Sequence, residues 1–336
     1  MRKKTIAPLI LLFYILSPRA LAAAPGDLLV PVGQAVGIQV NCRGVIVSEL
    51  AAVRTENGPV SPAESAGLRP GDRIVSFNDA PVLTGPDFLR SAAEMDGASV
   101  RLRAFRNGEE RLFTVTPARS IQGDWQLGLW LRDGVHGIGT VTYWDPDSGW
   151  FGALGHGISL PENEELLPVS GGVITRAAVT DVVPGCRGAA GELIGVPDRD
   201  AVLGTLERNT SQGVFGEADG LTGLAAVPAA SDGQIRLGTV TVLTTVDREG
   251  PREFAAEITR IVRGGAPTRQ LTLRITDPAL LKITGGIVQG MSGSPILQDG
   301  RLVGAVTHVL LSDPTTGYGI TMENMLAAAG QSASAA

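Results

Sequence analysis

Short apolar runs separated by glycine, proline and asparagine turns make up most of this chain. The runs Val36–Val40 and Arg43–Ser48 have the length and the β-branched content expected of short strands. The segments Ser99–Arg106 and Glu110–Thr116 flank Asn107-Gly108, a dipeptide that favours a two-residue hairpin turn. This pattern predicts paired strands in the first part of the chain.

Two short helices are predicted among these strands. Small residues over Ser61–Leu68 favour a helical turn, which is followed by the strand Arg73–Phe77. A second helix is predicted over Gly85–Met95, with Phe88 and Leu89 facing inward. The first part of the chain is therefore predicted to be a small domain of strands and two helices.

The second part of the chain, from residue 125 to 326, alternates strands and turns with few helical periods. This spacing is typical of a β-sandwich or barrel. The predicted strands are Gly137–Tyr143, Gly172–Val183, Gln234–Thr245, Glu253–Val262, Leu271–Ile275 and Leu302–Leu311. Residues 329–336 are predicted to be a flexible tail.

Composition supports a folded protein of about two domains. The chain has 336 residues, of which 43% are hydrophobic and 18% are charged, values that argue against a mainly disordered protein. Its 44 glycines favour many short strands and turns over long helices. The net charge of −6 gives no support for nucleic-acid binding, which normally needs a basic face.

The N-terminus has the three parts of a secretory signal. Arg2, Lys3 and Lys4 precede an apolar run over Ile6–Leu16, and small residues at Ala20–Ala22 follow. Residues 1–22 are therefore predicted to be a signal peptide cleaved after Ala22, with a linker over residues 23–27. An uncleaved signal anchor is the alternative, although the run is short for a membrane span. The remainder is predicted to be exported and peripheral to the membrane.

Metal and cofactor chemistry has no support in this sequence. The chain has two cysteines, Cys42 and Cys186, and three histidines, and the spacing of these residues predicts no metal-ligand cluster. The two cysteines fall in different predicted domains, so they do not indicate a disulfide framework. We expect neither a metal nor a cofactor.

Residues Ser61–Ile74 resemble the core signature of PDZ domains. The resemblance implies a PDZ domain over residues 28–118. Such domains bind an extended peptide by adding it as a strand beside an exposed sheet edge. The matching carboxylate-binding loop would be Val36-Gly37-Ile38-Gln39, which departs from the usual Gly-Leu-Gly-Phe pattern.

The stretch Gly290–Pro295, Gly-Met-Ser-Gly-Ser-Pro, has the character of a serine-peptidase nucleophile loop. Glycines permit the tight turn that exposes a serine hydroxyl. The backbone N–H groups of Gly290 and Ser292 would then hold the negative oxygen of a tetrahedral intermediate. A turn joining two strands is the alternative, and Ser294 is the competing hydroxyl within the loop.

A nucleophilic serine needs a base, and histidine is the usual one. His156 lies at an apolar strand end flanked by glycines, which leaves room for its ring to face a cleft. His308 follows the nucleophile loop in the next predicted strand, and His136 lies near a predicted surface turn. Local context favours His156 and leaves the other two open.

The third member of a catalytic triad is a carboxylate that orients the imidazole. Asp277 lies 292 − 277 = 15 residues before Ser292, at the end of a predicted strand. The dipeptide Asp277-Pro278 is equally typical of a helix N-cap followed by proline at the first helical position. Spacing alone does not choose between these two roles.

Two segments, Gly152–Ile158 and Thr276–Ile296, resemble the stage IV sporulation protein B family, and the continuation Gly304–Gly319 fits as well. The resemblance covers about residues 28–326. It implies an N-terminal PDZ domain followed by a chymotrypsin-like double β-barrel serine endopeptidase over residues 119–328. It also assigns His156 as the general base, Asp277 as the orienting acid and Ser292 as the nucleophile.

The same resemblance implies a biological role. Members of this family act between the two membranes around a developing endospore, where they process themselves. They also cut a regulator of a membrane-embedded protease and so trigger late sigma-factor activation. The implied partners are this protein substrate and the chain's own N-terminal region, held by the PDZ domain. The alternatives are an envelope quality-control protease and a PDZ scaffold without catalytic activity.

Overall fold

The computed structural model describes residues 23–330 of the chain. The predicted signal peptide and most of the predicted tail lie outside these residues. Within residues 23–330 no helix is long and apolar enough to span a membrane.

Six antiparallel strands close the first barrel. They follow the order β2, β11, β12, β15, β14 and β13, and β13 pairs back onto β2. Short strands β1 and β16 extend this sheet beside β11. The bounds are β1 Leu28–Pro31, β2 Ala35–Leu50, β11 Leu129–Trp144, β12 Trp150–Ala153, β13 Gly171–Val183, β14 Glu192–Thr210, β15 Gly213–Ala218 and β16 Val227–Pro228.

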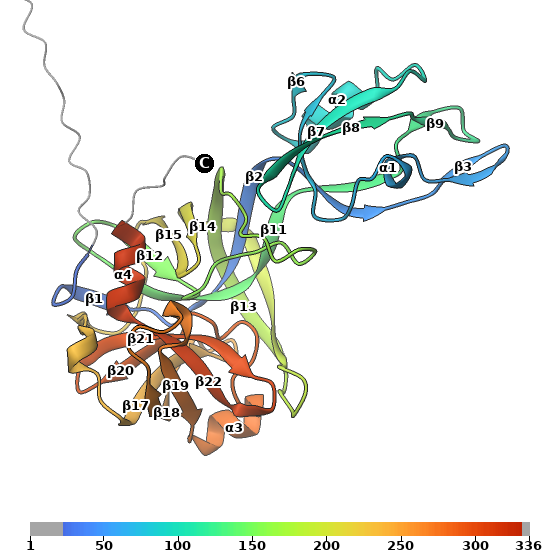
Figure 1. Cartoon of the computed structure of the whole chain (residues 1–336). Coiled ribbons are helices and arrows are strands. Elements are labelled where there is room, and N and C mark those ends of the chain that lie inside the picture. Colours follow the sequence, from blue (N-terminus) through green and yellow to red (C-terminus); the bar gives the residue numbers. More distant parts are fainter. Residues whose placement is uncertain (1–22, 331–336) are drawn as a thin grey trace, which may run out of the picture.

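A second closed barrel follows in the order β17, β18, β19, β22, β21 and β20. Its bounds are β17 Gly238–Thr245, β18 Pro251–Ile261, β19 Leu271–Ile275, β20 Pro295–Gln298, β21 Arg301–Leu310 and β22 Asp313–Thr321. Helices α3 (Pro278–Thr284) and α4 (Met322–Gly330) and the short 3-10 turns Asp232–Gln234 and Pro267–Arg269 complete it. Figure 1 shows the two barrels packed together, in the chymotrypsin-like arrangement predicted from the sequence.

The alternation of buried and exposed side chains explains why these strands close into barrels. In β19 the pattern runs buried, partly buried, buried, exposed, buried, so Leu271, Leu273 and Ile275 all point into the barrel. Each barrel has its own apolar core. The first barrel's β13–β14 hairpin also reaches the second core, to which it contributes Val179 and Leu193.

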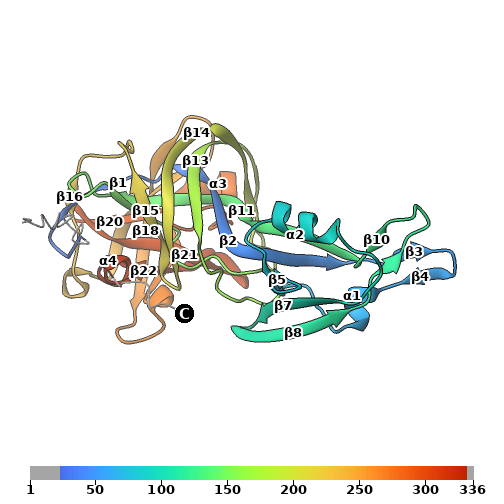
Figure 2. The ribbon, with the colours of Figure 1, turned by 90° about the horizontal axis from the view of Figure 1, so that it is seen from above.

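The PDZ domain is an insertion in the first barrel. Strands β2 and β11 each run from the barrel wall into this domain, which lies between them in the sequence (Figure 2). Its remaining elements are β3 Val53–Thr55, β4 Gly58–Val60, α1 Pro62–Ser65, β5 Arg73–Phe77, β6 Ala80–Pro81, α2 Gly85–Ala92, β7 Val100–Arg106, β8 Glu109–Val115, β9 Ala118–Arg119 and β10 Trp125–Gln126. A separate apolar core holds them together.

This insertion corrects the predicted domain boundaries. Residues 28–41, predicted as the start of the PDZ domain, form β1 and the barrel half of β2. The PDZ domain also continues past residue 118, because Leu127 lies in its core and β11 begins there at Leu129. At the other end of the chain, α4 runs to Gly330 and buries Ala329, so the ordered fold extends past the predicted start of the tail.

The predicted second helix is present but shorter. It corresponds to α2, whose Phe88 is buried. Leu89 is 68% exposed, contrary to the prediction, because it lies one residue round the helix from the buried face. The predicted hairpin across Asn107-Gly108 is confirmed as β7 and β8.

Side-chain contacts connect the PDZ domain to the loop that follows His156. Arg132 donates two hydrogen bonds to the Glu162 carboxylate, at 2.8 and 2.7 Å. The Gly108 N–H donates to Glu165 Oε1 at 3.1 Å. The two domains therefore meet through charge-assisted hydrogen bonds as well as through shared strands.

Candidate active site

The nucleophile loop turns sharply between α3 and β20. Gly290 and Gly293 have φ values of +94° and +95°, in the left-handed region. A Cβ at Gly293 would lie 2.0 Å from Thr140 O and 2.5 Å from Leu154 N. Glycine at position 293 is therefore required both by the backbone conformation and by the close approach of the first barrel.

The two serines of the loop have different surroundings. Ser294 is fully buried, and its Oγ donates to Met291 O at 2.7 Å and bonds Thr244 Oγ1 at 2.9 Å. Ser292 is partly exposed, and its Oγ donates to Thr307 O at 2.6 Å. Only Ser292 is therefore accessible to a substrate.

Two backbone N–H groups beside Ser292 are free to bind an oxygen. Within residues 23–330, neither the Gly290 N–H nor the Ser292 N–H donates to a protein acceptor. The intervening Met291 N–H donates to Val288 O at 3.1 Å, and the Gly293 N–H donates to Val306 O at 2.8 Å. Paired and unpaired N–H groups therefore alternate along the loop. The two unpaired donors are the ones that the sequence predicts as an oxyanion hole.

His156 follows β12 after two residues with left-handed backbone, Leu154 at φ +69° and Gly155 at φ +70°. Its Nδ1 lies 2.9 Å from Gly157 O. Because a carbonyl oxygen can only accept, this contact places a proton on Nδ1 and leaves Nε2 as the acceptor. The carbonyl therefore fixes the tautomer that a general base needs.

The structure brings the rings of His156 and His308 together. Their ring centroids lie 5.1 Å apart. His308 directly follows Thr307, whose carbonyl accepts the Ser292 hydroxyl. By contrast, His136 is an exposed residue of β11 that pairs with Gln39.

Both histidines favour their neutral forms. Burial lowers the pKa of His156, and the hydrogen bond with Gly157 opposes this effect in part. Burial, the neighbouring His156 and the Arg269 charge together lower the pKa of His308 to about 4. Its Nδ1 is buried without a hydrogen-bond partner among residues 23–330. A neutral imidazole is the form that accepts a proton from a serine.

Asp277, the predicted orienting acid, has a different role in this structure. Its carboxylate accepts N–H groups from Ala279 at 2.8 Å, Leu280 at 3.2 Å and Ala255 at 3.2 Å. It thus caps α3 and attaches the helix to β18. His308 lies on β21, and two strands separate β18 from β21 in either direction around the second barrel. The two strands therefore lie on opposite sides of the barrel. The N-cap interpretation is correct, and within residues 23–330 no hydrogen bond or ion pair joins Asp277 to a histidine.

The predicted PDZ loop Val36-Gly37-Ile38-Gln39 also has another position. These residues lie in the barrel half of β2, hydrogen-bonded to β11 on one side and to β13 on the other. A strand paired on both edges has no edge to offer a peptide. The prediction of a peptide-binding loop at this place is therefore wrong.

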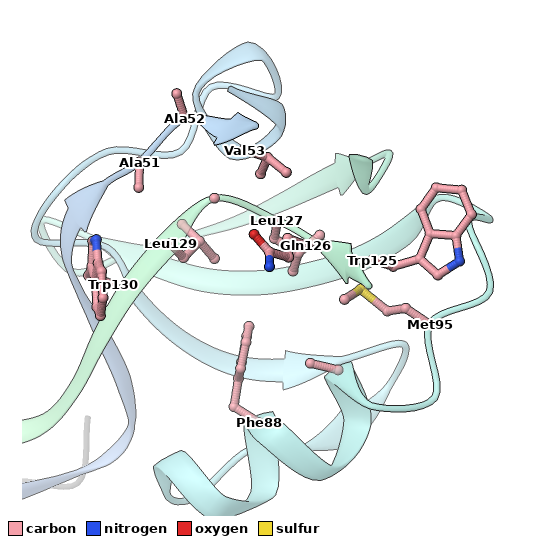
Figure 3. A pocket seen from close by; sticks show the side chains of 12 residues that line it. Ala51, Ala52, Val53, Phe88, Met95, Trp125, Gln126, Leu127, Leu129 and Trp130 are labelled. Atoms are coloured by element: carbon pink, nitrogen blue, oxygen red, sulfur yellow. The ribbon is translucent and has the colours of Figure 1, made fainter. Parts of the chain in front are cut away.

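A groove in the PDZ domain lies between α2 and the start of β11 (Figure 3). Its volume is about 380 Å³. Helix α2 and the turn after it contribute Phe88, Ala92 and Met95, and the facing chain is Trp125–Trp130. In residues 23–330, the edge of β11 away from β2 has no strand partner at Leu129–Arg132. An extended peptide fits this edge as an added strand.

The loop that enters this edge is Gln126-Leu127-Gly128-Leu129, close to the usual Gly-Leu-Gly-Phe pattern. Gly128 has φ +75°, and a Cβ there would lie 2.3 Å from Ala51 O. This loop pattern can be read in the sequence, but it lies after residue 118, the predicted end of the PDZ domain. A PDZ domain whose binding strand comes last in the chain accounts for this position.

Comparison with protein families agrees with both parts of this structure. The profile of the SpoIVB peptidase S55 family matches residues 123–326, more than half of the chain. A PDZ domain profile matches residues 55–104.

Similarity to individual proteins is partial. Magnetosome formation protease MamE of Magnetospirillum gryphiswaldense is 38% identical over 92 residues, covering 26% of this chain and 11% of that protein. Zinc metalloprotease RasP of Geobacillus kaustophilus is 33% identical over 72 residues, covering 21% of this chain and 17% of that protein. The chain thus spans less than a fifth of these two relatives.

Among solved structures, an inactive serine-to-alanine mutant of Rv3671c from M. tuberculosis H37Rv is similar. The identity is 14% and the TM-score is 0.31, with 57% of this chain and 80% of that chain covered.

Substitutions of Asp277 separate helix capping from catalysis. Asp277→Asn keeps an oxygen acceptor for the N-terminus of α3 but removes the charge, whereas Asp277→Ala removes both. We expect Asp277→Ala to lower the free energy of unfolding by about 1 kcal/mol, measured by urea denaturation. We expect Asp277→Asn to keep peptidase activity within about threefold of wild type. A loss of about 10⁴-fold in Asp277→Asn would instead show that this carboxylate orients the base.

The partly buried His308 makes stability depend on pH. Between pH 6.5 and about 4 the unfolded chain binds a proton at His308 that the folded chain does not bind, because folding lowers this pKa. His308 therefore makes the free energy of unfolding fall as the pH falls through this window. We expect His308→Gln to weaken that fall, measured by urea unfolding at several pH values.

The matched control for this measurement is His136→Gln, which replaces an exposed histidine. The slope of His308→Gln is compared with the slopes of both this variant and wild type. Equal slopes for wild type and His308→Gln would contradict the assignment.

Proposed function

The chain belongs to the SpoIVB peptidase S55 family, and we propose that it is an exported endopeptidase of narrow specificity with Ser292 as its nucleophile and His156 as its base. The observation that carries this proposal is the approach of the segment before His156 to the nucleophile loop, where a Cβ at Gly293 would lie 2.5 Å from Leu154 N. The accessible hydroxyl of Ser292, the His156 ring and the unpaired N–H groups of Gly290 and Ser292 come from loops of both barrels. A serine peptidase needs a nucleophile, a base and oxyanion donors.

The reaction begins when the Ser292 Oγ leaves Thr307 O and turns to His156 Nε2. As Oγ bonds to the substrate carbonyl carbon, His156 takes the hydroxyl proton, and the N–H groups of Gly290 and Ser292 hold the oxyanion. His156 then gives this proton to the leaving amine as the C–N bond breaks. Water hydrolyses the acyl-enzyme by the same path in reverse.

Gly157 O takes the place of an orienting carboxylate in this scheme. Its hydrogen bond with Nδ1, at 2.9 Å, opposes the pKa lowering by burial. It thereby favours the imidazolium that forms during the reaction. We propose a catalytic pair, Ser292 and His156, rather than a triad that includes Asp277.

Family membership also supports the biological role. We propose that the enzyme acts between the membranes around the developing endospore, processes its own N-terminal region and cleaves a regulator of a membrane-embedded protease. That cleavage then triggers late sigma-factor activation. The insertion of the PDZ domain within the peptidase domain gives the two a fixed connection, which suits regulated cleavage more than general degradation.

The PDZ groove supplies the recognition of protein partners in this proposal. Its free strand edge at Leu129–Arg132 and its apolar lining on α2 fit an extended peptide. The partners are the chain's own N-terminal region and the protein substrate.

Serine-directed chemistry tests the nucleophile. We expect a fluorophosphonate probe to label wild type and Ser294→Ala but not Ser292→Ala, because only the Ser292 hydroxyl is accessible. Mass spectrometry of the mature N-terminus should show self-processing in the same two proteins and not in Ser292→Ala. Continued self-processing by Ser292→Ala, or an unlabelled wild type, would contradict the proposal.

Charge placed in the groove tests the peptide site. Ala92→Glu puts a carboxylate into the groove, and Leu89→Glu puts the same group on the exposed face of α2. We expect wild type and Leu89→Glu to enrich the same sequences from a peptide display library, and Ala92→Glu to lose them. Enrichment of that set by Ala92→Glu would place peptide binding elsewhere.

A further inference from the structure

Thr140 lies where the two barrels meet at the nucleophile loop. It is fully buried in β11, and three of its polar groups bond to the catalytic loops. Its Oγ1 donates to Gly290 O at 2.7 Å and its N–H donates to Ser292 O at 3.1 Å. Its carbonyl accepts the Leu154 N–H at 3.2 Å. One residue therefore contacts both the serine loop and the segment that carries His156.

The neighbouring carbonyls of the loop are also held. Gln289 O accepts the Leu193 N–H at 2.9 Å, and Gly293 O accepts Thr142 Oγ1 at 2.7 Å. Met291 O accepts the Ser294 N–H and Oγ within the loop itself. From Gln289 to Gly293, every carbonyl thus has a donor.

These bonds decide where the oxyanion donors point. In a trans peptide the C=O and the following N–H point in opposite directions. Gln289 O points to Leu193, so the Gly290 N–H of the same peptide unit points away from Leu193. Met291 O points to Ser294, so the Ser292 N–H of that peptide unit points away from Ser294. Between these two units lies the Gly290–Met291 peptide, whose N–H donates to Val288 O. Its carbonyl, Gly290 O, accepts a hydrogen bond from Thr140 Oγ1, and within residues 23–330 this is the only donor to that oxygen.

We propose that Thr140 is a positioning residue for the reaction: its hydroxyl fixes the Gly290–Met291 peptide and thereby aims the N–H groups of Gly290 and Ser292 at the substrate oxygen. This inference rests on the proposed function of Ser292. The hydroxyl touches no substrate atom and acts through the loop. Because the Thr140 carbonyl also holds Leu154, the same residue sets the distance between the serine loop and the His156 segment.

Thr140→Val tests this role, because valine keeps the side-chain volume and both backbone bonds and removes only the hydroxyl. The readout is the kinetics of fluorophosphonate labelling, whose phosphoryl oxygen occupies the oxyanion position. We expect the maximal labelling rate constant to fall about tenfold, while the half-saturating probe concentration changes less than about twofold. Thr140→Ser, which restores a hydroxyl, should recover the rate to within about threefold.

Thr321→Val is the matched control. It removes another buried threonine hydroxyl, one that bonds Gln270 Oε1 at 3.0 Å and does not touch the nucleophile loop. We expect it to lose stability without losing the labelling rate. If Thr140→Val does not fold, Thr140→Ala gives the same comparison, with rates taken per folded molecule from thermal unfolding curves.

The outcomes separate this inference from the proposed function. Wild-type labelling with an unchanged rate in Thr140→Val would overturn the positioning role and leave Ser292 as the nucleophile. An unlabelled wild type would overturn both. A slow Thr140→Ser would show that the site needs the threonine shape rather than its hydroxyl, and would also overturn the proposal.

Discussion

The candidate active site depends on hydrogen bonds from the first barrel to the carbonyl groups of the Gly290–Pro295 loop in the second. Thr140 N–H, Thr140 Oγ1, Thr142 Oγ1 and Leu193 N–H all bond to loop carbonyls. With the carbonyls held on this side, two N–H groups stay unpaired on the other. The packing of one barrel on the other is therefore part of the candidate active site.

The PDZ domain is joined to this arrangement by the same strands. Strand β11 borders the peptide groove at Leu129 and reaches the nucleophile loop at Thr140. A second connection runs from Arg132 to Glu162, in the loop that follows His156. Peptide recognition and catalysis thus share continuous backbone, whereas a flexible linker would leave them independent.

The sequence predicted the fold class and the tight turn that carries Ser292, because short motifs determine local structure. Gly293 permits the tight turn of the nucleophile loop. Gly155 and Gly157 permit close packing around His156, because a Cβ there would lie 2.9 Å from Ile320 Cγ2 and 2.3 Å from Leu166 Cδ1, respectively. Other predictions failed where one local pattern serves two structures. Asp277 before a proline fits a cap as well as a triad acid, and only the distance across the barrel decides between them. The Val36–Gln39 run fits a loop or a strand, and long-range pairing with β13 decides.

The most direct test of this account is a crystal structure of the wild-type chain after reaction with a fluorophosphonate. The account predicts phosphorus on Ser292 Oγ and a phosphoryl oxygen about 2.7–3.1 Å from the nitrogens of both Gly290 and Ser292. It also predicts that the Thr140 Oγ1 bond to Gly290 O is kept and that the His156 ring lies beside the adduct. A phosphoryl oxygen turned away from these two nitrogens, or an adduct on Ser294, would contradict it.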